Sequence, residues 1–304
     1  MTHEAPIVTN ISAAVQPCLN RFAGITLVQI ESDHPARYTM ESDGPRRLVV
    51  TLPDARTRMP DGSIRVCDGL LHEISLARQD HGLRIALVLD HATGSTAYVV
   101  PGLPARLCIA LQRAPLWRIM HGRAIVVDPG HGGEDHGGRG PIDLLEKDMT
   151  LAVARCLAEQ LKHLDCAVTL TREDDRALSW PDRCAVADRA GAEAMVVLHT
   201  GWFPDPSIAG TRVCWLNDVG QTLALCIYET AVRKLPLPAR GCGAGRPWAD
   251  LAAPVVLVEF ATISNPVEEG WLRSCTFHKR AAGAIVNGLK DHFAGGAYGR
   301  PPAG

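Results

Sequence analysis

The chain has 304 residues, the length of one large domain or of two ordinary ones. Hydrophobic residues make up 46% and charged residues 21%, with a net charge of −2, so the composition is that of a globular protein and its charge does not indicate a nucleic-acid partner. No apolar run approaches the roughly 20 residues that span a bilayer, so we expect no transmembrane helix.

The first segment, residues 1–20, reads MTHEAPIVTNISAAVQPCLN and is expected to form a flexible N-terminus. It lacks a basic segment followed by an apolar core, so it does not predict a Sec signal peptide.

Residues 21–113 show the rhythm of β-structure. In GLRIALVLD and RLCIALQ, large apolar residues alternate with other residues, and RRLVVTL, ITLVQIE and HEISLAR are further strand candidates. The turn signals SDGP, PDGS, DHG and PGLP separate them. Several short strands with turns between them, and no clear helical pattern, predict a small all-β sandwich domain.

The rhythm changes after residues 114–121, which are interpreted as a linker. AIVVD, AMVVL and PVVLV are continuous apolar runs, typical of strands buried on both faces of a parallel sheet. Helical patterns lie between them, as in GQTLALCIYETAVRKL and HKRAAGAIVNGLKDHF. Residues 122–294 therefore predict an α/β domain with a mostly parallel sheet flanked by helices, and residues 295–304 a disordered tail.

The ten cysteines include no C-x-x-C pair, which disfavours a cysteine zinc knuckle. Several lie in apolar runs, as in RLCIALQ and TRVCWL, so they are interpreted as small buried hydrophobic residues. A disulfide framework stays open as an alternative.

A titratable side chain follows each of the three buried runs. AIVVD leads into PGH, which ends in His131, while AMVVL is followed by His199 and PVVLV by Glu259. Ligands of open α/β sheets bind beyond the carboxyl ends of the strands, so these side chains are expected to meet there. Two histidines and one carboxylate with an open fourth position make a catalytic zinc site, and Glu146 is the candidate carboxylate.

Each of these residues also has a structural interpretation. Asp143-x-x-Glu146 fits a helix capping box, in which Glu146 would bind backbone rather than metal. His131 can be a turn residue, and His199 can be a strand-end residue paired with backbone. Glu259 is the hardest to explain structurally, because a glutamate is rarely buried without a partner.

The motifs IVVDPGHGGEDHGG, LLEKDMTLAVARCLAEQL, VTLTREDD, VVLH and PVVLVEFATISNP follow one another in this order. Over about residues 123–293, the chain resembles the zinc-dependent N-acetylmuramoyl-L-alanine amidases of the amidase_3 type. The resemblance implies that His131, Glu146 and His199 bind Zn²⁺ and that Glu259 is the catalytic glutamate. The implied substrate is the peptidoglycan amide between the lactyl group of N-acetylmuramic acid and L-alanine.

The N-terminal half, through GPRRLVVTLPDA and ISLARQDHGLRIALVLD, resembles the AMIN-like β-sandwich that precedes some of these amidases and is linked to envelope targeting. The chain departs from the family close to the second histidine. Val197 and Gly201 stand where members usually have Ser and Asn, and Ala261-Thr262 where they often have Gly-Phe. These departures bear on the surroundings of the site rather than on the metal set.

In the mechanism that this resemblance implies, zinc activates a water, and Glu259 takes its proton and delivers it to the leaving nitrogen. Arg172 is interpreted as a structural partner of Asp175, with substrate orientation as the alternative. Two other functions stay open: a zinc peptidase acting on another amide, and a non-catalytic wall-binding protein.

Peptidoglycan is the expected partner. The family implies a periplasmic or envelope location, and a cytoplasmic one is the alternative because no signal peptide is visible. Some members carry a helix that plugs the zinc until an activator removes it. Here the interval from His199 to Glu259 already holds two predicted strands and a helix near 220–234, so no activator is expected to be required.

Overall fold

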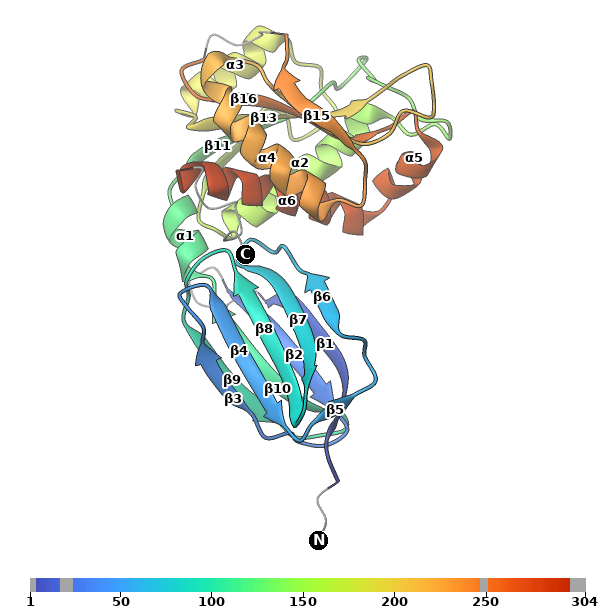
Figure 1. The fold of residues 1–304 in the computed structure, drawn as a ribbon. Coiled ribbons are helices and arrows are strands. Elements are labelled where there is room, and N and C mark those ends of the chain that lie inside the picture. Colours follow the sequence, from blue (N-terminus) through green and yellow to red (C-terminus); the bar gives the residue numbers. More distant parts are fainter. Residues whose placement is uncertain (1–3, 17–23, 247–250, 296–304) are drawn as a thin grey trace. The chain divides into compact units, whose positions relative to one another are not determined.

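The computed structural model describes residues 4–16, 24–246 and 251–295 (Figure 1). The chain divides into two compact units, residues 1–118 and 119–304. The division falls within α1 (Ala114–Met120), a short helix at the place of the predicted linker.

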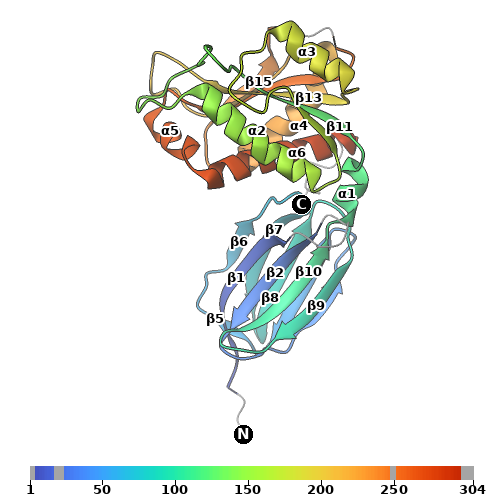
Figure 2. The same ribbon diagram turned by 180° about the vertical axis from the view of Figure 1, so that it is seen from behind.

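The first unit consists of two five-stranded sheets, which lie face to face in both views of the ribbon (Figures 1 and 2). All paired strands are antiparallel except β1 and β5. One sheet has the order β5 (Arg56–Thr57), β1 (Ile7–Gln16), β2 (Ile25–Ser32), β10 (Ala105–Gln112) and β9 (Ser95–Val100). The other has the order β3 (Thr39–Ser42), β4 (Arg47–Pro53), β8 (Gly82–Leu89), β7 (Leu71–Gln79) and β6 (Gly62–Arg65).

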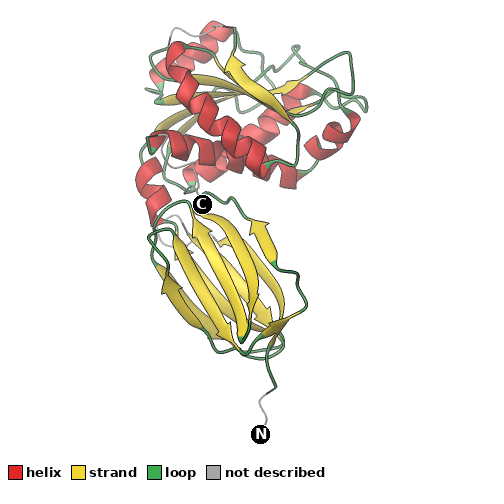
Figure 3. Cartoon of the chain, viewed as in Figure 1, coloured by secondary structure: helices red, strands yellow, loops and turns green. Residues whose placement is uncertain are grey.

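The alternation in β8 explains this packing. Leu83, Ile85, Leu87 and Leu89 are buried, whereas Arg84 between them is only partly covered. Each strand thus turns one apolar row toward the other sheet, as a sandwich core requires. Between residues 24 and 113 the structure contains strands and loops and no helix (Figure 3).

The expectation of a flexible N-terminus over residues 1–20 is wrong for much of that segment. Ile7–Gln16 forms β1, which pairs with β2 along its length and with β5 at its start. Val8 and Ile11 are buried, so the strand contributes to the core of the unit. Residues 1–3 and 17–20, with Cys18, lie outside the described residues, as does 296–304 of the predicted tail.

The second unit contains one six-stranded sheet. Neighbouring strands are parallel, except that β14 runs antiparallel to β16. The order across it is β12 (Ala167–Leu170), β11 (Ala124–Pro129), β13 (Ala194–Gly201), β16 (Val255–Thr262), β14 (Thr211–Trp215) and β15 (Ala239–Ala244).

Helices cover this sheet. α6 (Cys275–Phe293) packs between α2 (Glu146–Lys162) and α4 (Gln221–Lys234), and α2 and α4 lie against the sheet. Ile125, Val126, Met195 and Val196 are fully buried, as expected for central strands that are covered on both faces. The remaining helical segments are α3 (Trp180–Arg189), α5 (Pro266–Leu272) and the 3₁₀ turn η1 (Asp218–Gly220).

None of the nine cysteines that the structure describes belongs to a disulfide bond. Cys67, Cys108, Cys166 and Cys214 are buried, in agreement with their interpretation as small hydrophobic residues. Cys275, at the start of α6, is exposed, so that interpretation is wrong for it.

Candidate metal centre

The candidate site is built at the ends of three neighbouring strands. β13 lies between β11 and β16 in the sheet, and in the register Pro129 is opposite Leu198 and His199 is opposite Glu259. β13 and β16 continue for two and three residues beyond these positions, to Gly201 and Thr262, rather than ending at them. The parallel register therefore brings the three strand-end segments to one edge of the sheet.

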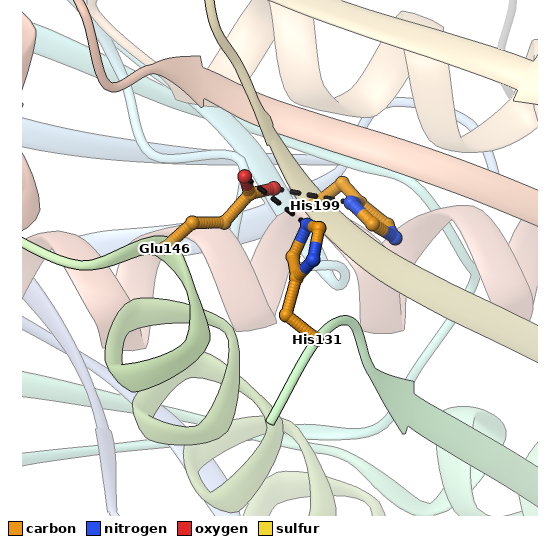
Figure 4. A group of neighbouring side chains, drawn as sticks. All are labelled: His131, Glu146 and His199. Carbon is orange, nitrogen blue, oxygen red and sulfur yellow. Dashed lines mark hydrogen bonds and ion pairs between the residues drawn. The ribbon is translucent and has the colours of Figure 1, made fainter. Parts of the chain in front are cut away.

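Two histidines and one glutamate converge there (Figure 4). Nε2 of His131 lies 3.2 Å from Oε2 of Glu146, and Nδ1 of His199 lies 3.0 Å from Oε1 of the same carboxylate. The two imidazole rings are 4.7 Å apart, centre to centre. One ligand atom from each residue lies within 4.8 Å of the others, so the group can hold a metal ion.

Glu146 is fixed in this position by the backbone. It is the first residue of α2, and its carboxylate accepts hydrogen bonds from the N–H groups of Gly138 and Thr200, each 2.7 Å long. Burial alone raises the pKa of Glu146, but the hydrogen bonds to His131 and His199 outweigh it and hold the pKa well below its ordinary value. The carboxylate is therefore anionic, as a metal ligand must be.

The capping alternative for Glu146 is wrong. The residue before the helix is Leu145, and no side chain caps α2. Asp143 has a φ of 62° and accepts a hydrogen bond from Arg139 instead, at 2.9 Å. The spacing of a capping box occurs here without its geometry, because the chain turns between Asp143 and the helix.

His131 stands in the left-handed backbone region, with a φ of 63°. Its Nδ1 lies 2.9 Å from Oδ2 of Asp135, which leaves Nε2 directed at Glu146. Burial alone lowers the pKa of His131, but the hydrogen bonds to Glu146 and Asp135 outweigh it and raise the pKa. A carboxylate on the far ring nitrogen is the arrangement that orients metal-binding histidines in proteins.

The glycines around His131 make room for the two rings. A Cβ on Gly130 would lie 2.5 Å from Nε2 of His199, and a Cβ on Gly137 would lie 2.5 Å from Cδ2 of His131. Both separations are shorter than van der Waals contact. The glycine-rich loop is thus a steric requirement of the site.

Buried arginines hold the loop from beneath. Arg183, from α3, donates to Oδ1 of Asp128 at 2.5 Å and to the carbonyl oxygen of His131 at 2.9 Å. Arg172 is buried and donates to the carbonyl oxygens of Pro129 and Gly130. Arg183 is not among the residues that the sequence singles out, because its acceptors are a side chain and a backbone carbonyl oxygen more than 50 positions away.

Arg172 and Asp175 attract one another electrostatically, but the predicted direct pair between them is not formed. Oδ2 of Asp175 lies 2.7 Å from Nζ of Lys147, and its Oδ1 accepts from the N–H of Gly133 at 2.8 Å. Arg172 has a structural role, but it acts through backbone carbonyl oxygens. An arginine buried this deeply needs several acceptors, and an exposed aspartate supplies too few.

Glu259 is opposite His199 in the register of the sheet and is not a member of the three-residue group. Its Oε2 is 2.8 Å from Nη1 of Arg240, which comes from β15. The guanidinium group of Arg240 also lies over the ring of Phe203, 4.5 Å from its centre. A Cβ on Gly201 would be 2.5 Å from Nη1 of Arg240, so the glycine leaves room for this arginine. Nothing in the sequence spacing indicated Arg240 as the partner of Glu259.

Comparisons with known proteins show the family of the chain. The family model for N-acetylmuramoyl-L-alanine amidase matches residues 125–291. The chain belongs to this family. It is 31% identical over 211 residues to the probable cell wall amidase LytH of Staphylococcus epidermidis. The matched region covers 68% of this chain and 70% of LytH.

Solved structures of amidases match the second unit. The N-acetylmuramoyl-L-alanine amidase AmiC2 of Nostoc punctiforme has a TM-score of 0.54 and 29% identity, covering 56% of this chain and 96% of its own. The catalytic domain of CwlV, from Bacillus (Paenibacillus) polymyxa var. colistinus, has a TM-score of 0.55 and 28% identity, covering 57% and 98%. The amidase is thus an enzyme of the N-acetylmuramoyl-L-alanine amidase type, with that family's catalytic fold. Within the residues described, no helix is both long and apolar enough to cross a membrane.

Proposed function

We propose that this amidase uses Zn²⁺, held by His131, Glu146 and His199, to hydrolyse the amide between N-acetylmuramic acid and L-alanine in peptidoglycan. The observation that carries the proposal is the three ligand atoms within 4.8 Å of one another. Two imidazoles and one anionic carboxylate suit zinc, and three protein ligands leave a fourth position for the reaction. Zinc bound there supplies Lewis acidity, which polarises the amide carbonyl and lowers the pKa of water to about 7.

Glu259 is proposed as the proton shuttle. It lies opposite His199 in the register of parallel strands, which places both residues at the same level of the sheet. During hydrolysis, a water oxygen bonds to the lactyl carbonyl carbon while Glu259 accepts a proton of that water. Glu259 then gives the proton to the alanine nitrogen as the carbon–nitrogen bond breaks. Arg240 holds one carboxylate oxygen of Glu259, so the other is the one that takes part in proton transfer.

The first unit is proposed as an AMIN-like module that binds the cell envelope, and the enzyme is proposed to act outside the cytoplasm. The support is its all-β architecture and the relative LytH, which is described as a probable cell wall amidase.

The direct experiment is digestion of purified peptidoglycan. The proposal expects new N-terminal alanine and an intact glycan strand, with about one zinc ion per chain and loss of activity on chelation. Release of a different N-terminal residue would instead identify a peptidase that acts on another amide. Binding to the wall with no bond cleaved, by zinc-loaded protein, would identify a wall-binding protein.

A further inference from the structure

A partly exposed tryptophan lies next to the metal centre. Trp202 follows His199 by three residues, just beyond the end of β13, and its side chain is 52% exposed. A Cβ on Gly138 would lie 3.1 Å from both Cβ and Cδ1 of Trp202. The N–H of Gly138 donates to Oε2 of Glu146 at 2.7 Å. One glycine therefore separates the indole from a carboxylate of the candidate metal centre.

The indole is held in a fixed orientation. Its Nε1 donates to the carbonyl oxygen of Arg139, 3.2 Å away. The same Gly138 that contacts Trp202 also packs against Ile263, since a Cβ there would lie 3.0 Å from its Cγ2. The only polar group of the indole is thus occupied, and what the side chain offers to a ligand is a flat apolar face.

An apolar aromatic face suits the sugar of the substrate better than its stem peptide. The stem peptide carries amides and carboxylates, which require hydrogen-bond donors or a cation. A pyranose ring has a face of C–H groups, and it gains by covering an aromatic ring that is otherwise exposed to water. In a muramoyl peptide, the sugar is joined through its lactyl ether to the carbonyl group of the amide that is cleaved. The sugar must therefore lie close to the metal, where Trp202 is.

We propose that Trp202 is a specificity-determining residue that binds the N-acetylmuramic acid ring by stacking. This rests on the proposed function, because it assigns the sugar side of the same substrate. Trp202 selects substrates that contain the hexosamine, and a peptide amide without the sugar lacks this contact.

The test compares two substrates with the same scissile amide. One is an N-acetylmuramoyl peptide, and the other is the lactoyl peptide of the same sequence, which has no sugar ring. We expect Trp202→Leu to lower kcat/KM on the muramoyl peptide by about fivefold to tenfold. It should leave kcat/KM on the lactoyl peptide unchanged, and Trp202→Phe should keep most of the activity. Trp271→Leu is the matched control, since Trp271 is 43% exposed on α5 and has no contact with the metal centre among those described, so it should leave kcat/KM on both substrates unchanged.

An equal loss on both substrates would overturn the proposal, because it would show a structural role for Trp202, and so would no loss on either. A separate measurement covers the case in which neither substrate is cleaved, which would contradict the proposed function. Binding of the peptide-free disaccharide of N-acetylglucosamine and N-acetylmuramic acid is measured by calorimetry with the parent and Trp202→Leu. Weaker binding to the variant supports the sugar site, while equal or absent binding to both proteins overturns it.

Discussion

The two glutamates at the site differ in what surrounds them. The carboxylate of Glu146 accepts hydrogen bonds from two backbone N–H groups and lies between two imidazoles, so both its oxygens are fixed. Glu259 has a single ion pair with Arg240 and is 20% exposed. A fixed, buried carboxylate suits a metal ligand, whereas a partly exposed one suits proton transfer. Their surroundings therefore suit these two glutamates to different roles, although their side chains are chemically the same.

The corresponding substitutions should separate these roles. Glu259→Gln is expected to retain zinc and to lose turnover by roughly 10²–10⁴, because an amide cannot accept the proton of water. Glu146→Gln is expected to lose zinc, because the neutral amide removes the charge between the histidines. Metal content and turnover are measured on both variants. Zinc lost from the Glu259 variant and kept in the Glu146 variant would reverse the assignment.

The glycine loop allows a second test. Gly137 and Gly191 have similar φ angles, 67° and 58°, but a Cβ on Gly137 would collide with His131, while a Cβ on Gly191 would meet open space. Alanine at either position carries a backbone strain of about 1 kcal/mol. We expect only Gly137→Ala to weaken zinc binding, by about tenfold or more, measured by competition with a chelator. Equal zinc affinity in the two variants would mean that the loop adapts to the side chain.

That the three candidate ligands lie together could be predicted, because the two histidines follow short and strongly apolar runs and the family resemblance implies all three. His131, His199 and Glu146 meet as expected. The partners of charged side chains could not be predicted in the same way. Arg240 and Glu259 come from separate strands, and their pairing depends on the order of strands in the sheet. Arg172 binds backbone carbonyl oxygens, which leave no trace in a sequence.

At the scale of elements, the capping box is the most instructive case. The spacing of Asp143 and Glu146 allowed one before α2, but the structure has a capping box at α3, where the side chain of Ser179 accepts from the N–H of Asp182. α3 matters for the site because it carries Arg183, which holds the backbone of His131. The same spacing produces a capping box only where the residue that supplies the cap has an extended backbone directly before the helix, as Ser179 has and Asp143 has not.

Removing this cap should lower stability without removing the metal site. Ser179→Ala is expected to reduce the free energy of unfolding by about 1 kcal/mol, because a helix N–H loses its acceptor. Ser179→Asn retains a capping oxygen and should cost much less. Urea unfolding of the two variants measures the difference. A loss in the asparagine variant as large as in the alanine variant would mean that the cap is not the cause.

The interval between the second histidine and Glu259 allows another prediction at this scale. Its helical segments, among the residues described, are η1 and α4. Leu223, Ile227 and Ala231 of α4 are buried, so this helix is part of the core rather than a removable plug. We expect the purified enzyme to turn over without an activator. Turnover that appears only when a second envelope protein is added would contradict this.

The architecture of the elements was predictable only in part. The continuous apolar runs indicated the buried parallel strands β11, β13 and β16, which the structure confirms. The antiparallel contact of β14 with β16 was not visible, since strand direction depends on how the chain returns to the sheet. β1 was missed because IVTNISAAVQ alternates weakly, and its burial depends on pairing with β2.

On the scale of the whole molecule, the chain consists of two compact units, each with its own sheets. The candidate metal centre lies entirely within residues 119–304, so this unit should contain all the groups needed for hydrolysis. We therefore expect residues 119–304 alone to cleave soluble muramoyl peptides at the rate of the full chain. On intact wall, which is insoluble, the first unit should raise the local concentration of enzyme at its substrate, so the shorter protein should be slower by about tenfold or more. Release of N-terminal alanine from both substrates measures this.

Adding residues 1–118 as a separate protein is the control, and it should not restore the rate, because the effect depends on the covalent connection. Equal rates on intact wall would show that the first unit does not target the enzyme to it, while a slower rate on soluble peptides would show instead that the second unit needs the first for its own folding or activity.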